Sequence, residues 1–145
     1  MPSTTRDATT HWTGGLREGT GHVTLDSSNV GQFDVTFPSR FASPDGKTSP
    51  EELIAAAHSA CLAMNLSGVL GAEGITADSI DVSAEVTLST TAEGAEISGI
   101  DITLRAAVPG LDAARFAELA STAERTCPVS KALAATKITL DAALA

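Results

Sequence analysis

Two cysteines are the residues of this chain best suited to covalent chemistry. Cys61 lies in a helix-forming run that follows Ser49, and Cys127 stands directly before Pro128, where a second helix is expected to begin. A thiol at a helix start ionises more readily, because the helix end and nearby cations favour the thiolate. Two thiols in a chain without a secretion signal favour redox or nucleophilic chemistry over a structural disulfide. The alternative is two small buried residues, since free cysteine is among the most buried residue types.

Other chemistries have weaker support in the sequence. His58 precedes Cys61 by three residues, so the two side chains would be neighbours on a helix. A Cys–His hydrolase is one hypothesis, and a packed histidine beside an unrelated thiol is the alternative that we favour. We expect no metal site, because the distant cysteines and three scattered histidines lack ligand spacing. The sequence has no CxxC, Gly-x-Ser-x-Gly, GxGxxG or P-loop pattern.

Composition restricts the class of protein. With 145 residues, 43% hydrophobic and 19% charged, the chain is typical of one soluble globular domain spanning residues 1–145. Its formal net charge of -9 argues against nucleic acid and anionic membranes as partners. Residues 1–10 are polar, so we expect a loose terminal segment rather than a signal peptide. We expect no stretch long enough to cross a membrane and a cytoplasmic location.

The helix that should carry Cys61 has the clearest start signal in the chain. Ser49 is a natural N-cap, Pro50 fits the first helical position, and Glu52 completes a capping box. The pattern predicts a helix from there to about Leu70. Its residues are apolar or small nearly all round, so we expect burial on most faces.

The remaining pattern predicts strands and two further helices. Alternating residues predict strands, a Gly-rich turn joins the first two, and Asp112 should cap a helix running to about Glu124. The order favours an α+β fold with antiparallel sheets around a long central helix and does not indicate βαβ winding. The expected strands are 11–13, 22–25, 32–37, 80–88, 97–108 and 137–144, and a short helix is expected at 129–135.

Three charged residues have ordinary interpretations when taken alone. Arg40 should end a strand before the loop into the long helix, and Arg17 lies in the Gly-rich turn, so both would be surface residues. Glu51 is a first-turn carboxylate, which the helix dipole favours. Ten residues of helix separate Glu51 from Cys61 by about 15 Å, so the two cannot share a site within one straight helix.

Two cysteine motifs resemble those of the OsmC/Ohr family, the osmotically inducible and organic-hydroperoxide-resistance proteins. The segments Ser49–Leu53 and Ala55–Cys61 are similar to the family pattern around its first cysteine, and Cys127–Lys131 is similar to the second. With His11–Gly14 and Ile138–Leu140, the resemblance covers nearly the whole chain. The branch resembles OsmC more than Ohr because of the Arg40-Phe41 pair, His11-Trp12 and His58.

The resemblance implies a thiol-dependent peroxidase that reduces organic hydroperoxides. Cys61 would be the peroxidatic thiol and Cys127 the resolving thiol. Arg40 would hold the thiolate and polarise the peroxide, and Glu51 would fix the guanidinium. Ohr-type relatives carry their arginine in the Gly-rich segment, so Arg17 is the reserve for that role.

The resemblance also implies the partners. Members of the family are intertwined homodimers, and an antiparallel second helix, approaching over the Ala-rich run 55–63, would bring Glu51 of one chain near Cys61 of the other. The family works without bound cofactor and implies a dithiol reductant of the lipoyl type. The alternative is a thiol-sensing or small-molecule-binding protein on the same scaffold with little turnover. The apolar side chains expected in a substrate pocket are Phe33, Phe37, Phe41, Leu62 and Met64.

Overall fold

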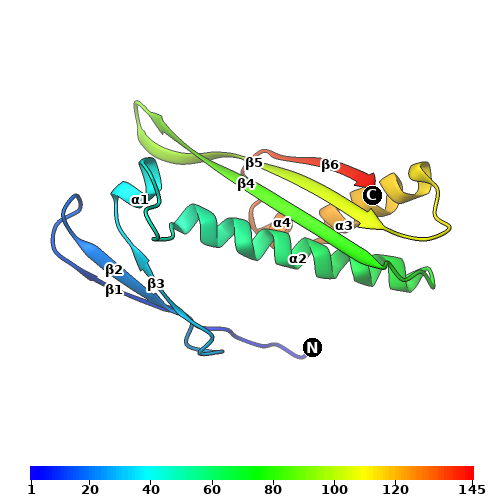
Figure 1. Ribbon diagram of the computed structural model, residues 1–145, viewed down its shortest axis with the longest axis horizontal. Coiled ribbons are helices and arrows are strands. Elements are labelled where there is room, and N and C mark those ends of the chain that lie inside the picture. The colour runs from blue at the N-terminus through cyan, green and yellow to red at the C-terminus, as the bar shows by residue number, and fades with distance from the viewer. The chain divides into compact units, whose positions relative to one another are not determined.

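A computed structural model describes residues 1–145 (Figure 1). The chain forms two compact units, an N-terminal unit (Met1–Leu53) and a C-terminal unit (Ile54–Ala145). Residues 1–8 have no regular structure, and the first strand begins at Thr9, inside the segment expected to be loose.

The N-terminal unit contains a three-stranded antiparallel sheet. Its strands β1 (Thr9–Thr13), β2 (Thr20–Thr24) and β3 (Gln32–Val35) lie in that order. Trp12 of β1 is paired with Gly21 of β2, and a Cβ atom built on Gly21 would lie 2.8 Å from the indole ring. Glycine at this position therefore lets the indole lie against the neighbouring strand.

A one-turn helix, α1 (Pro38–Phe41), follows β3 and corrects one prediction. Arg40 was expected at the end of a strand, but β3 ends at Val35 and Arg40 lies in the last turn of α1. Pro38 explains the change, because proline lacks the N–H that a strand would use and suits the first turn of a helix. Ser39 anchors α1, because its Oγ lies within hydrogen-bond distance of the carbonyl oxygens of Thr36 (2.8 Å) and Thr48 (2.9 Å), which share its one hydroxyl proton.

The long helix α2 (Pro50–Ala72) begins in the N-terminal unit and continues in the C-terminal unit. Ser49 caps it by accepting a hydrogen bond from the Glu52 N–H at 3.1 Å. Only half of the predicted capping box is present, because the Glu52 carboxylate accepts from the Thr48 hydroxyl instead. The helix ends before Gly74, whose φ of 72° lies in the left-handed region.

One face of α2 is open in the single chain. Leu62, Leu66 and Leu70 are fully buried, whereas small and apolar residues on another face are exposed. Burial on most faces, as predicted, is therefore absent from the single chain. The exposed residues include Ala56, Ala57, Ala60, Met64, Ser67 and Gly68.

The length of α2 corrects a second prediction. With 23 residues and a mean hydropathy of 1.6 over its most apolar window, α2 is long and apolar enough to cross a membrane, by length and composition only. No such stretch was expected from the sequence. The core helix of a folded domain can have the same composition, and three leucines of α2 lie in the core of the C-terminal unit.

The C-terminal unit contains a mixed sheet of β4 (Ser79–Thr91), β5 (Gly94–Ala107) and β6 (Ile138–Leu144), in that order. β4 and β5 form the predicted long antiparallel hairpin. β6 pairs with β5 in parallel, which differs from the antiparallel sheet expected. A parallel pair needs a crossover connection, and α3 (Ala113–Thr126) and α4 (Pro128–Ala132) supply it.

Helices α2 and α3 pack with this sheet to form the main core. Asp112 caps α3 as predicted, accepting from the Arg115 N–H at 2.9 Å. The predicted α+β class is confirmed, with two small sheets and one long helix. The fully buried residues of the core include Leu62, Leu66, Leu70, Ile100, Leu104, Ala120 and Cys127.

Candidate active site

The N-terminal unit brings two of the predicted site residues together. Arg40 in α1 and Glu51 in the first turn of α2 form an ion pair, with Nη2 2.5 Å from Oε1. The Arg40 Nε–H lies 3.2 and 3.3 Å from the two carboxylate oxygens, so the contact is two-pronged. Glu51 is only 6% exposed, whereas the Arg40 side chain keeps 33% of its surface. The structure thus leaves part of the Arg40 side chain accessible while its guanidinium is held by Glu51.

The pair stays charged at neutral pH. Burial alone would raise the pKa of Glu51, but the hydrogen bonds and charge of Arg40 outweigh it and hold this pKa below its ordinary value. The hydrogen bond from Glu51 raises the pKa of Arg40. Each residue therefore stabilises the charge of the other.

An apolar cavity of about 360 Å³ lies beside Arg40 in the N-terminal unit. Of the five predicted pocket residues, only Phe37 lines it. Phe41 flanks Arg40 instead, with its ring centroid 5.9 Å from the guanidinium carbon and 5.1 Å from the Phe37 ring. The walls comprise Thr10, Trp12, Leu16, Val23, Val35, Thr36, Phe37, Arg40, Pro50 and Leu53.

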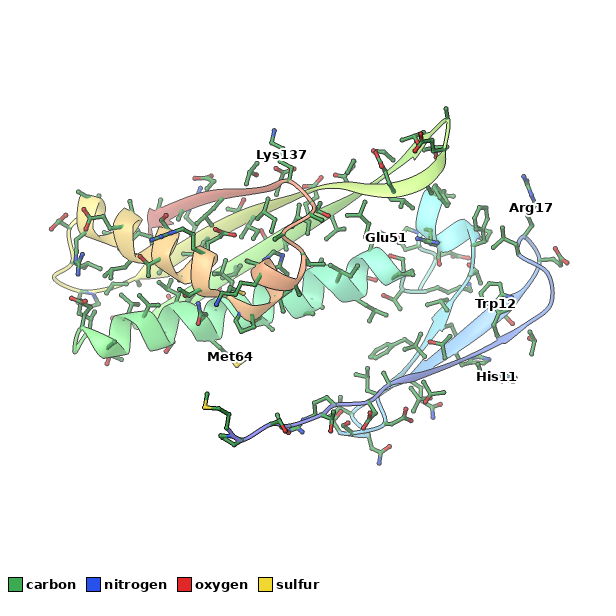
Figure 2. The ribbon with its side chains drawn as sticks, turned by 180° about the vertical axis from the view of Figure 1, so that it is seen from behind. His11, Trp12, Arg17, Glu51, Met64 and Lys137 are labelled. Carbon is green, nitrogen blue, oxygen red and sulfur yellow. The ribbon has the colours of Figure 1, made fainter.

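The other predicted pocket residues lie elsewhere. Phe33 is 40% exposed on β3 and does not line the cavity. Leu62 is fully buried in the core of the C-terminal unit and does not line the cavity. Met64 is 70% exposed and projects from α2 away from the β4–β5–β6 sheet (Figure 2).

Sequence reasoning missed most of the cavity lining. Val23 and Val35 are the buried valines of β2 and β3, and the alternation of apolar residues places each on a single face of its strand. The sequence indicates Trp12 only as part of the His11-Trp12 motif, and in the structure its indole Nε1–H donates to the Gly14 carbonyl at 3.1 Å. Its position in a short hairpin gives no sequence signal for a wall of a cavity.

Arg17 lies outside this arrangement. It lines a second, polar cavity of about 520 Å³ together with Glu18, Asp45 and Lys47. It forms no ion pair, in contrast to Arg40. In the N-terminal unit, Arg40 and not Arg17 has a carboxylate partner.

The C-terminal unit brings the two cysteines together. Both are free thiols, Cys61 half-buried and Cys127 fully buried. Burial raises the pKa of Cys61, the Val129 backbone lowers it, and the Cys127 thiol raises it again through hydrogen bonding and charge. The two thiols are therefore close neighbours. Within this unit nothing outweighs the cost of ionising Cys61.

His58 does not form a catalytic pair with Cys61. Its Nε2 lies 2.8 Å from the Ser130 Oγ, and its Nδ1 is buried without a partner. Burial lowers the pKa of His58, and the charge of Glu124 acts in the opposite direction. These contacts fit the packed histidine. No group of three or more His, Cys, Asp or Glu side chains could hold a metal ion.

Comparisons with known proteins identify relatives of the chain. The family model described as "OsmC-like protein" matches residues 43–141. The chain is 44% identical to "Peroxiredoxin OsmC" of Escherichia coli over 131 residues, which is 90% of each protein.

Solved structures extend the similarity to almost the entire chain. An organic hydroperoxide resistance protein OsmC from Legionella pneumophila is 26% identical, with a TM-score of 0.77 over 99% of both chains. OhrB of Bacillus subtilis is 29% identical, with a TM-score of 0.71 over 96% of this chain and 98% of its own. With a family match over more than half of its length and a relative that is 44% identical, this chain belongs to the OsmC-like family.

Proposed function

We propose that this protein is a peroxiredoxin-like enzyme that reduces organic hydroperoxides, with Cys61 as the attacking thiol and Cys127 as the resolving thiol. The observation that carries the proposal is the neighbouring pair of free thiols with unequal exposure. Cys61 is partly exposed, so a peroxide can reach it, whereas Cys127 is buried directly beside it. The printed names of the relatives, a peroxiredoxin and organic hydroperoxide resistance proteins, support the same activity.

The proposed cycle uses only these thiols and a dithiol reductant. The Cys61 thiolate attacks one peroxide oxygen, the O–O bond breaks, and the released alkoxide takes a proton to become an alcohol. Cys61 is then a sulfenic acid. The Cys127 sulfur attacks the Cys61 sulfur, water leaves, and a disulfide forms. A dithiol of the lipoyl type exchanges with this disulfide, returns two thiols and leaves as a cyclic disulfide.

The raised pKa of Cys61 means that the thiolate needs a cation. We propose that Arg40 supplies it, held in orientation by Glu51. Along α2, Glu51 and Cys61 are about 15 Å apart, and no Pro or Gly between them permits a bend. The arginine of one chain would therefore serve the thiol of a second.

The open face of α2 supports this homodimer. Small exposed side chains at Ala56, Ala57 and Ala60 permit close approach of a second helix, and exposed apolar surface is stabilised when a partner covers it. A two-fold axis would generate two equivalent sites. The apolar cavity beside Arg40 would then receive the carbon chain of the peroxide.

A stopped-flow assay tests the function directly. Reduced protein is mixed with cumene hydroperoxide and dihydrolipoamide, and consumption of the peroxide is followed. We expect multiple turnovers and a higher kcat/KM for cumene hydroperoxide than for hydrogen peroxide, because an apolar wall gains free energy by burying substrate carbon. One oxidation per subunit without turnover would instead favour the thiol-sensing protein.

A further inference from the structure

A buried contact crosses the C-terminal unit next to the thiols. His58 lies one turn before Cys61 on α2, and its Nε2 bonds the Ser130 Oγ on α4 at 2.8 Å. His58 is 0% exposed and Ser130 is 5% exposed. The Nδ1 of His58 has no partner, so the bond to Ser130 is the one hydrogen bond that the imidazole ring forms with the protein.

A second contact lies on the other side of Cys61. Asn65, one turn after Cys61, donates from Nδ2 to the Ala123 carbonyl at 2.6 Å and to the Thr126 Oγ1 at 2.8 Å. Ala123 and Thr126 belong to the last turns of α3.

These contacts bracket the second thiol. Cys127 is both the C-cap of α3 and the N-cap of α4, with extended backbone angles of -60° and 123°. It lies between Thr126, which Asn65 holds, and Ser130, which His58 holds. The Cys127 N–H donates to the Glu124 carbonyl at 3.2 Å and the Cys127 carbonyl accepts from the Lys131 N–H at 3.0 Å, so its backbone is tied to the last turn of α3 and the first turn of α4. The position of its thiol therefore depends on how these two turns are held against α2.

We propose that the His58–Ser130 and Asn65–Thr126 contacts form a thiol clamp, in which these four side chains position Cys127 against Cys61 for disulfide formation. Fixed orientation raises the effective concentration of one reacting group near another. The clamp rests on the proposed disulfide cycle, but it concerns the second step alone. Its residues are positioning residues, since none of them contacts peroxide in the proposed cycle.

Ser130→Ala is the sharpest test, because it removes one oxygen atom and leaves the helix intact. After one equivalent of cumene hydroperoxide, a sulfenic-acid reagent such as dimedone competes with disulfide closure. We expect peroxide consumption in the first turnover to change less than about twofold, while closure slows at least about tenfold and Cys61 becomes labelled. Asn65→Leu should also slow disulfide closure.

Two matched variants separate positioning from general damage. His58→Gln keeps a nitrogen that can bond Ser130, so it should keep most of the closure rate of the unchanged protein. His58→Leu has no such nitrogen and should close slowly. Ser59→Ala removes a hydroxyl that bonds only the Ala56 carbonyl of its own helix, so it should leave closure unchanged. Equal closure rates in Ser130→Ala and the unchanged protein would overturn the clamp.

A thermodynamic measurement distinguishes the clamp from the peroxidase. The equilibrium between protein dithiol and oxidised lipoamide requires no peroxide. We expect Ser130→Ala to lower the disulfide-forming equilibrium constant about tenfold, because the thiols lose effective concentration. An unaltered constant would contradict the clamp even in an active peroxidase. Absence of any Cys61–Cys127 disulfide in the unchanged protein would overturn the proposed cycle itself.

Discussion

The two units of this protein differ in the polar groups that they hold together. The N-terminal unit holds a preformed ion pair, in which Arg40 and Glu51 satisfy each other's charge at 2.5 Å. The C-terminal unit holds two free thiols, and burial raises the pKa of Cys61 there. The fixed charges thus lie in one unit and the two thiols in the other. In the proposed function, a Cys61 thiolate at neutral pH would use the arginine of the N-terminal unit of a second chain.

The largest expected effect comes from removing the nucleophile. Cys61→Ser should reduce peroxide consumption to background, because no other thiol in the unit is accessible. Cys127→Ser should keep one fast oxidation per subunit and then stop with a sulfenic acid on Cys61. Mass spectrometry of the oxidised variants checks both outcomes. Residual turnover in Cys61→Ser would exchange the roles of the two cysteines.

Removing the cation should have the next largest effect. Arg40→Ala is expected to raise the pKa of Cys61 further and to lower kcat/KM about 10- to 100-fold, since each unit of pKa costs about tenfold in thiolate at fixed pH. In the same variant, the curve of kcat/KM against pH should shift to higher pH. Arg17→Ala is the matched control, because Arg17 has no carboxylate partner. If Arg17→Ala is the damaging change, the two arginines exchange roles.

Mixing inactive subunits tests whether charge and thiol come from different chains. Glu51→Ala and Cys61→Ser subunits are refolded together, so that about half of the dimers are mixed. In each mixed dimer one site would combine an intact Glu51 with an intact Cys61, so about a quarter of the original activity should return. A site built within one chain would stay inactive in every combination. A fully active monomer by light scattering would also exclude the shared site.

The sequence predicted the local elements better than their long-range pairing. Ser49 and Asp112 identified both helix starts because a capping side chain acts on its own neighbourhood. β6 was expected in an antiparallel sheet, yet it runs parallel to β5, because the short helices α3 and α4 together form the crossover. Alternation predicts a strand and its buried face, but it contains no information about the direction of the partner.

The sequence predicted which candidate residues lie together better than it predicted their surroundings. The cysteine motifs and the family resemblance predict roles for Cys61, Cys127, Arg40 and Glu51, which stay predictions, and the structure brings these residues together in two pairs. The predicted pocket rests on residue type alone. Leu62 shows why this is insufficient, because an apolar residue near a thiol can belong to the core as readily as to a cavity. Cavity walls depend on which faces of separate elements meet, and local sequence does not record that.

The smallest expected effect concerns the pH dependence of stability in the N-terminal unit. The pKa of Glu51 is held below its ordinary value of 4.5, so its ion pair contributes stability above that pH. This contribution is lost as the pH falls through the lowered pKa and Glu51 takes up a proton. The Glu51→Gln variant lacks this contribution to stability at every pH. The Tm difference between the unchanged protein and Glu51→Gln, on the order of a few degrees at pH 7, should therefore narrow as the pH falls from about 5 to about 3. Glu52→Gln, one residue along the same helix and exposed, is the control, and its Tm should stay nearer that of the unchanged protein. A constant difference for Glu51→Gln across this range would show that the carboxylate contributes through packing and not through its charge.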